Sequence, residues 1–228
     1  AIKTQGDLQM KWWKVLAIVL MLYSIIGGFL IDVPRLPILH ETIRNTYFHV
    51  TLWFAMMILM TISVVNSIRY LSNGDKKHDY LANETVNIGL FFGVLGLTTG
   101  MIWAQFTWGA FWVNDVKTNG TAITLLVYFA YAVLRGSVDD PKKKARLGAV
   151  YNIFAYVMLI LFLWILPRIT DSLHPGNGGN PAFGSYDMDN TMRMVFYPAI
   201  IGFFLLGWWL VTLRIRLKNI QDKLVEDV

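Results

Sequence analysis

The chain contains no cysteine, and charged residues are scarce along it. Without cysteine it forms neither a disulfide nor a thiolate-ligated iron–sulfur centre. Charged residues make up 15% of its 228 residues, whereas an average soluble domain carries about 25%. The sequence also holds no Walker loop, no nucleophile elbow and no internal repeat. We therefore expect a protein that is not an enzyme and that is unlike a soluble globular domain.

Long runs without charge lie between the clusters of charged residues. Six of them are long enough to cross a bilayer, which takes about 17–25 residues of helix. They cover residues 15–31, 45–68, 85–114, 118–134, 147–167 and 194–213. The sequence predicts an all-α, polytopic membrane protein with six transmembrane helices, forming a single domain over residues 1–228. Segments 66–84 and 135–146 are predicted to be short polar loops.

The distribution of Lys and Arg predicts how these helices are oriented. If the N-terminus is inside, the inner segments hold fifteen of the twenty Lys and Arg, and the outer segments hold five. Cytoplasmic segments retain the basic residues, so both termini are predicted to be cytoplasmic. The basic residues of the inner segments account for the sequence pI of 9.4 without a nucleic-acid partner. We expect them to orient the helices and to contact anionic lipid. The first run has no cleavage site after it, so we expect a span there and not a signal peptide.

The middle of every predicted span lacks Asp, Glu, Lys, Arg and His. Buried charges mark most ion and proton paths, so their absence disfavours a secondary transporter or a pump. Chemistry is expected at the ends of the spans instead. His40, His49 and His174 fall at the outer ends, whereas His78 falls among charges on the inner side and is predicted to be solvated.

The outer end also carries an unusual density of aromatic residues between Trp103 and Gly120. Such residues can form an interfacial belt, or their flat faces can receive a porphyrin. Likewise, His49 can be a hydrogen-bonded interfacial residue or a metal ligand, and His174 lies in a loop rich in Gly, Pro and Asn. Two histidines suit the two axial positions of haem iron, whereas zinc needs further protein ligands.

These residues resemble the motifs of the haem-handling WWD family of cytochrome c biogenesis. That family includes the six-span CcmC-type haem exporter protein C and the larger CcsA-type haem-attachment subunit. The CcmC pattern has a tryptophan at the end of span three and then W-G-x-W-W-V-W-D-x-R. The matching residues here are Trp103, Trp108, Gly109, Trp112, Val113 and Asp115. The family's R-x-x-Y-x-H-V-P motif is matched by Arg44, Tyr47, His49 and Val50, and its T-L-H motif by Ser172, Leu173 and His174.

The chain departs from the family pattern at four positions. Phe111 and Asn114 stand where the pattern has tryptophan, and Thr51 stands where it has proline. Lys117 replaces an arginine, which keeps the charge but loses the planar guanidinium. The resemblance implies that haem b is bound outside the membrane, with His49 and His174 as its axial ligands. The implied haem-binding residues are His49, His174, Trp103, Trp108, Trp112, Asp115, Arg44 and Lys117.

The resemblance also implies what the protein does and with which partners. It places the chain in the bacterial cytoplasmic membrane, where it passes haem to a periplasmic, CcmE-type haem chaperone for cytochrome c maturation. Its implied partners are ABC-type subunits, a small single-span subunit and membrane lipids. Asp115 is expected to bond loop amides or to meet the chaperone, and Lys117 to pair with a haem propionate. The alternatives are a CcsA-type subunit and a respiratory membrane cytochrome b.

Overall fold

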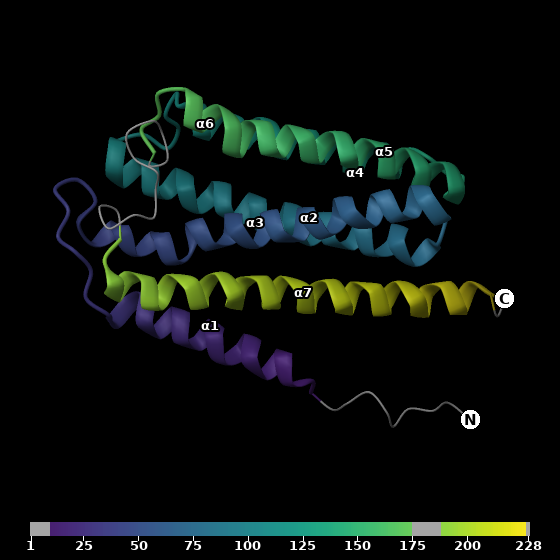
Figure 1. Ribbon diagram of the computed structural model, residues 1–228, viewed down its shortest axis with the longest axis horizontal. Helices are drawn as coiled ribbons and strands as arrows, with labels where there is room; N and C mark the ends of the chain where they lie inside the picture. The colour runs from purple at the N-terminus through teal and green to yellow at the C-terminus, as the bar shows by residue number, and fades with distance from the viewer. Residues whose placement is uncertain (1–9, 175–187, 227–228) are drawn as a thin grey trace.

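The computed structural model describes residues 10–174 and 188–226, which are mostly helical and contain no strand (Figure 1). Two of the elements differ from α-helix: η1 is a 3-10 helix, and η2 is a π-helical turn inside a longer helix. The elements are α1 (Trp12–Leu30), η1 (His40–Tyr47), α2 (His49–Asn73), α3 (Lys76–Trp108), α4 (Val116–Gly136), α5 (Pro141–Ile160), η2 (Leu161–Ile165), α6 (Leu166–Ile169) and α7 (Asn190–Glu226).

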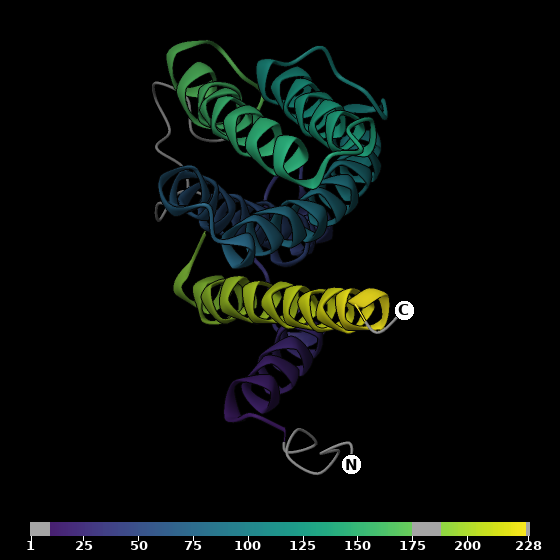
Figure 2. The ribbon, with the colours of Figure 1, turned by 90° about the vertical axis from the view of Figure 1, so that its right-hand side faces the viewer.

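The long helices run roughly parallel to one axis and stack in layers (Figure 1). Helices α2 and α3 form the central layer, with α4 and α5 covering one side of it and α7 the other (Figure 2). Helix α1 is outermost and contacts only α7 and η1 among the described elements. The starts of α2 and α4 and the ends of α3 and α6 therefore meet at one end of the bundle, and this end carries the candidate site.

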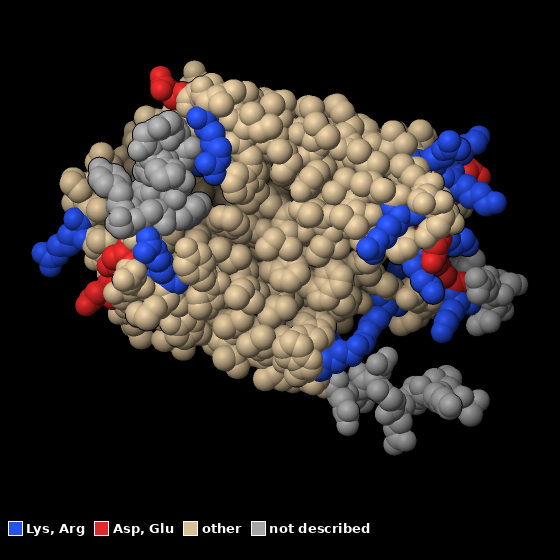
Figure 3. All heavy atoms as spheres, in the orientation of Figure 1, with Lys and Arg blue, Asp and Glu red and all other residues tan. Residues whose placement is uncertain are grey.

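Five of the helices are long and apolar enough to cross a membrane. They are Trp12–Leu30, His40–Asn73, Lys76–Trp108, Pro141–Ile169 and Asn190–Leu224. Helix α4 is the sixth long helix and falls outside this group, although it packs against α5 and α3. On the face shown in Figure 3, charged side chains gather near the two ends and leave an uncharged middle. The apolar helices fit a multi-pass membrane protein.

Two predicted boundaries are wrong, those of the loop 66–84 and of the span 85–114, because the helices do not end where the uncharged runs end. The predicted loop 66–84 is helical except at its centre, where Gly74 adopts a left-handed φ of 69° and ends α2. Helix α3 then begins within the charged segment, where the Asp75 side chain accepts from the Lys77 amide. At its other end α3 stops at Trp108 because Gly109 is left-handed, with φ 79°. The aromatic stretch is therefore part helix and part loop.

The core lies between the central layer and its neighbours. Large side chains such as Met56, Leu59, Tyr128 and Leu159 are fully buried there. Helix α3 approaches both α2 and α4 closely because it presents small residues: a Cβ on Gly93 would lie 2.9 Å from Met56 of α2 and 2.6 Å from Leu125 of α4. Small residues at such contacts are typical of membrane helix pairs. This packing fixes the ends of α2 and α3 relative to each other.

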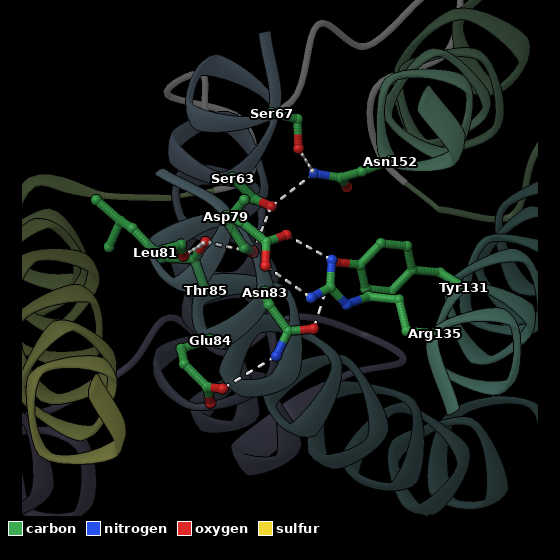
Figure 4. A network of polar contacts seen from close by, with 11 residues as sticks. Ser63, Ser67, Asp79, Leu81, Asn83, Glu84, Thr85, Tyr131, Arg135 and Asn152 are labelled. Atoms are coloured by element: carbon green, nitrogen blue, oxygen red, sulfur yellow. Dashed lines mark hydrogen bonds and ion pairs between the residues drawn. The ribbon is translucent and has the colours of Figure 1, made fainter. Parts of the chain in front are cut away.

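A buried polar network joins the helices at the end opposite the candidate site (Figure 4). Arg135 of α4 donates two hydrogen bonds, of 2.6 and 3.0 Å, to the carboxylate of Asp79 in α3. Beside this pair, the Asn152 amide donates to the hydroxyls of Ser63 and Ser67. Glu84 is also buried and pairs with Arg214 of α7. The sequence does not reveal this network, because Asp79, Glu84 and Arg135 fall in segments that are predicted to be polar loops.

Candidate functional site

His49 is the first residue of α2 and lies against α3. Its Nδ1 donates to the carbonyl of Gly96 over 2.9 Å and lies 3.2 Å from the hydroxyl of Thr99. The predicted span 45–68 begins before His49, but the 3-10 helix η1 covers its first residues up to Tyr47, and α2 begins at His49. The bond to α3 leaves Nε2 of His49 without a hydrogen-bond partner among the described residues.

A glycine on α3 makes room for the His49 ring. A Cβ at Gly100 would lie 2.6 Å from Cε1 of His49, closer than real Cβ contacts come. Trp103, one turn further along α3, packs edge-on against the same ring, with centroids 5.8 Å apart and planes at 78°. The Trp103 N–H donates to the Thr42 hydroxyl of η1. Helix α3 thus holds the imidazole through the Gly96 carbonyl and the Trp103 indole, and Gly100 leaves the space that the ring occupies.

His174 is held by the residue that begins α4. Its Nδ1 donates to the Asp115 carboxylate over 2.9 Å, and the Leu173 amide donates to the other oxygen over 2.8 Å. The Ser172 hydroxyl adds a further bond to Asp115. Asp115 also caps α4 by accepting from the Lys117 amide. The side chain of Asp115 is therefore the anchor for the Ser172–His174 segment as well as a helix cap.

The electrostatics of Asp115 support this anchoring role. Only 6% of the residue is exposed. Burial alone would raise the pKa of its carboxyl, but the hydrogen bonds from His174 and the Leu173 amide outweigh burial and hold that pKa well below its usual range. Asp115 is thus ionised at neutral pH and acts as an acceptor. An acceptor at Nδ1 fixes the tautomer of His174 with the proton on that nitrogen.

The two histidines lie at the same end of the bundle, each beside an indole of α3. His174 and Lys117 both lie close enough to His49 to interact with it electrostatically. The Trp108 ring lies 4.9 Å from the His174 ring at an interplanar angle of 64°. Each histidine therefore has an indole neighbour from the end of α3. Next to them the loop exposes Phe111 and Trp112, which are 56% and 44% exposed.

Arg44 lies beside the site and is already held by the protein. Its Nε donates to Glu41, and one terminal nitrogen donates to the carbonyl oxygens of Gly28 and Ile31. The guanidinium thereby ties η1 to the end of α1. Arg44 also lines a cleft of about 380 Å³. The other lining residues are Phe29, Glu41, Thr42, Asn45, Phe48, Thr99, Ile102, Trp103 and Phe106.

The other histidines lie elsewhere. Nδ1 of His78 donates to the amide oxygen of Asn66 over 2.9 Å at the opposite end of the bundle, and the residue is half-buried. The prediction that it is solvated is therefore wrong, because α3 begins before it and packs it against α2. His40 starts η1 with a positive φ of 45°. The sequence predicted neither the acceptor role of Gly96 nor the gap at Gly100, since a backbone carbonyl and a missing side chain leave no motif.

The donor set fits haem better than a bare metal ion. Among the described residues no group of three or more His, Cys, Asp or Glu side chains lies close enough to hold a metal ion, whereas structural zinc sites use four ligands and catalytic ones three. Two imidazoles with Nδ1 bonded elsewhere offer two Nε2 atoms. Together with the indole and phenyl faces, this is the chemistry that a porphyrin with an iron centre requires.

Comparison with known proteins shows the family of the chain. A family model described as Heme exporter protein C (CcmC) matches residues 2–227. The chain belongs to the CcmC family. The predicted resemblance is confirmed by a match that spans all the long helices, and the family's place in haem transport and cytochrome c biogenesis fits the helical, membrane-type fold described above.

Several curated relatives carry the name Heme exporter protein C. The chain is 26% identical over 175 residues to that of Paracoccus denitrificans, an alignment that covers 77% of the chain and 72% of the relative. It is 23% identical over 219 residues to that of Rhodobacter capsulatus, covering 94% and 88%. For that of Escherichia coli K12 the figures are 26% over 129 residues, covering 57% and 51%.

Proposed function

We propose that the chain holds haem b at the outer face of the bacterial cytoplasmic membrane and passes it on for cytochrome c maturation. In this proposal His49 and His174 ligate the iron through their Nε2 atoms. Haem is the cargo, and the protein itself catalyses no bond-making step. The proposal extends the name of its relatives, Heme exporter protein C, to this chain.

One observation carries the proposal. Both histidine rings have Nδ1 bonded to a fixed acceptor, the Gly96 carbonyl for His49 and the Asp115 carboxylate for His174. Metal-ligating histidines commonly show this arrangement, because the acceptor sets the tautomer and makes the other nitrogen a better donor. The same acceptors also keep each ring from rotating when haem leaves.

The aromatic residues supply the apolar surface. We propose that Trp103, Trp108 and Trp112 contact the porphyrin and exclude water from it. The exposed faces of Phe111 and Trp112 extend the surface where the α3–α4 loop projects. Lys117 stands at the start of α4 next to Asp115 and is suited to a propionate. Arg44 acts from a distance in this scheme, since its bonds to Gly28 and Ile31 position η1 beside the cleft.

We further propose that all six long helices span the membrane, with both termini in the cytoplasm. The Lys and Arg count and the location of both histidines at one end of the bundle support this. The receiving partner is then a periplasmic, CcmE-type haem chaperone, and the assembly partners are ABC-type subunits and a small single-span subunit. In the CcsA-type alternative a longer chain with an extra histidine pair is expected, whereas the CcmC model matches this chain nearly end to end.

The haem content of the purified chain tests the proposal. The protein would be produced with haem available, purified in detergent, and assayed for haem per chain. We expect His49→Ala and His174→Ala each to lose most of the haem, because each removes one of two axial bonds. His78→Ala should retain it, since His78 lies at the opposite end of the bundle. Full haem content in either site variant would refute the proposed ligands.

A second arm tests the aromatic surface. Trp108→Ala should lower haem affinity on the order of ten-fold, because an indole contributes its buried area and about 0.5–1.5 kcal/mol of ring–ring contact. Trp108→Phe keeps an aromatic face and should cost less. Trp12→Ala is the matched control, since Trp12 is 76% exposed at the far end of α1. Equal losses in Trp108→Ala and Trp12→Ala would make the tryptophans a plain interfacial belt.

A further inference from the structure

A basic cleft lies between α1 and α7, at the opposite end of the bundle from the candidate haem site. It measures about 240 Å³, and its lining residues are Lys11, Trp13, Lys14, Thr212, Ile215 and Arg216. Three of these six side chains are cationic, and none is acidic. The cations come from the start of one helix and the last third of another, so the cleft concentrates positive charge across a helix–helix contact.

Two tryptophans fix the position of a lysine in this cleft. The ammonium of Lys14 lies 5.2 Å from the centre of the Trp209 ring and 5.7 Å from that of Trp13. The two rings pack edge to face, with centroids 6.4 Å apart. Contacts of this kind hold a cation without neutralising it, because the ring carries no net charge. The two rings therefore hold the Lys14 ammonium in a half-buried, defined position.

The cleft opens at the level where the lipid headgroups of the membrane are expected. Trp12, next to it, is 76% exposed, and tryptophan favours the level of the lipid headgroups. From Val15 onward the run is uncharged, and its outward side chains include Leu16, Val19 and Leu22, which are 37%, 54% and 54% exposed. A basic cleft thus adjoins an apolar helix surface in the direction of the bilayer (Figure 3 shows the charged end and the uncharged middle).

We propose that this cleft binds the phosphate of an anionic phospholipid. The phosphate oxygens accept from Lys11, Lys14 and Arg216, and the acyl chains lie along the exposed face of α1. Guanidinium and ammonium groups are the usual donors to phosphate, and basic pockets between membrane helices bind anionic headgroups. The adjoining apolar surface selects a lipid over free phosphate, because it gives the acyl chains a place to pack.

The lipid has a structural task in this arrangement. Helix α1 contacts only α7 and η1 among the described elements, and Figure 2 shows it at the edge of the stack. At one end it is tied to η1 through the bonds from Arg44 to Gly28 and Ile31. A phosphate that bridges α1 and α7 ties the other end. The anion also offers a counter-charge to Lys11 and Lys14 at the start of α1.

Native mass spectrometry of the purified, delipidated full chain tests the site. The probes are phosphatidylglycerol, which is anionic, and phosphatidylcholine, which has no net charge. We expect the native chain to retain phosphatidylglycerol on the order of ten-fold better. The double variant Lys11→Gln/Lys14→Gln should lose this preference, since each basic residue near an anionic surface contributes about five-fold. Lack of any preference in the native chain would overturn the proposal.

Two controls separate the cleft from general surface charge and from misfolding. The double variant Lys142→Gln/Lys143→Gln removes the same charge from exposed positions at the start of α5 and should keep the preference; an equal loss there would overturn the proposal. Lys11→Gln alone leaves the Lys14 contacts in place and should reduce retention about five-fold. Displacement of phosphatidylglycerol by excess inorganic phosphate would overturn the lipid assignment, and resistance to it supports the lipid.

Discussion

At the scale of single residues, the two histidines differ in what holds their rings. His49 is bonded to a backbone carbonyl of α3, which no substitution removes. His174 is bonded to the Asp115 side chain, which a single substitution alters. The same carboxylate accepts from the Leu173 amide and caps α4. Asp115 thus positions the segment that carries His174 relative to the start of a long helix.

This difference predicts that Asp115→Asn affects haem through His174. Asparagine keeps one acceptor oxygen but has no charge, so the bonds from His174 and Leu173 weaken together. Replacing an outer partner of a ligating histidine lowers affinity by about ten- to hundred-fold, and we expect a loss in that range in a haem titration. The haem absorption spectrum of the variant should move toward that of His174→Ala. Native affinity in Asp115→Asn would remove Asp115 from the site.

The residue types of the site were more predictable than their bonds. Arg44, His49 and the aromatic stretch match the spacing of the family motifs. The same resemblance pointed to His174 and Asp115 from the sequence. The expectation that Asp115 bonds loop amides is met by its bonds from Leu173 and Lys117. Its bond to His174 crosses 59 residues of sequence. Such a contact depends on how α4 and α6 pack, and no local pattern records it.

At the scale of elements, helix α3 shapes the site through the missing side chain at Gly100. Gly100 faces His49 so closely that a methyl group there would lie 2.6 Å from the ring. The ring is held by Gly96 and packed against Trp103, so it has little room to move away. A glycine inside a helix is otherwise unfavourable by about 0.5–1 kcal/mol relative to alanine. Its presence is explained by the histidine and not by the helix.

Gly100→Ala should therefore weaken haem binding although alanine favours helix. We expect haem affinity to fall by about ten-fold or more, as for other changes that displace a ligand's surroundings, measured by titration of the purified variant. Gly136→Ala, at the end of α4, is the matched control because nothing lies within 4 Å of its Cβ position. That variant should bind haem normally. Normal binding in both would show that the close approach does not matter.

The ion pair between α3 and α4 should dominate stability at the other end. The side chains of Asp79 and Arg135 are 10% and 12% exposed, and removing one partner of a buried pair costs about 3–5 kcal/mol. Asp79→Asn should thus lower the thermal unfolding temperature clearly in detergent. Lys218→Gln breaks an exposed pair with Asp222 and should cost about 0–1 kcal/mol. Similar unfolding temperatures for the two variants would contradict a structural role for the network.

The positions of the elements were predictable where charge marks their ends, and less so where it does not. All six uncharged runs correspond to long helices. The predicted inner loop 66–84 shrank to a turn around Gly74, because α2 continues to Asn73 and α3 begins at Lys76. Within α3, Asp79 is buried and pairs with Arg135 of α4. A charge that is buried with a partner looks the same in sequence as one in solvent.

At the scale of the whole molecule, the proposed haem site faces the outside only if every long helix crosses the membrane and the two histidines lie on the outer side. Helix α4 is the critical element, because it is less apolar than the five others. If α4 did not cross, α5 would start on the outer side, and His174 after α6 would emerge on the side opposite Asp115. The hydrogen bond between His174 and Asp115 therefore requires that α4 and α5 both cross or that neither does.

Reporter fusions test this topology. A periplasm-active reporter joined after Ala110, in the α3–α4 loop, should be active, and one joined after Asp139, in the α4–α5 turn, should be inactive. A cytoplasm-active reporter should give the opposite pattern. A cytoplasmic signal at Ala110 would place the candidate haem site on the wrong side of the membrane.

Ligation of the haem iron by His49 and His174 is tested most directly by electron paramagnetic resonance of the ferric haem complex of the purified chain. Two imidazole ligands give a low-spin signal, so we predict a low-spin spectrum for the native protein. His49→Ala and His174→Ala should each convert haem that remains bound to a high-spin form, and added imidazole should restore the low-spin signal. A low-spin signal that persists unchanged in either variant, without imidazole, would contradict ligation by this histidine pair.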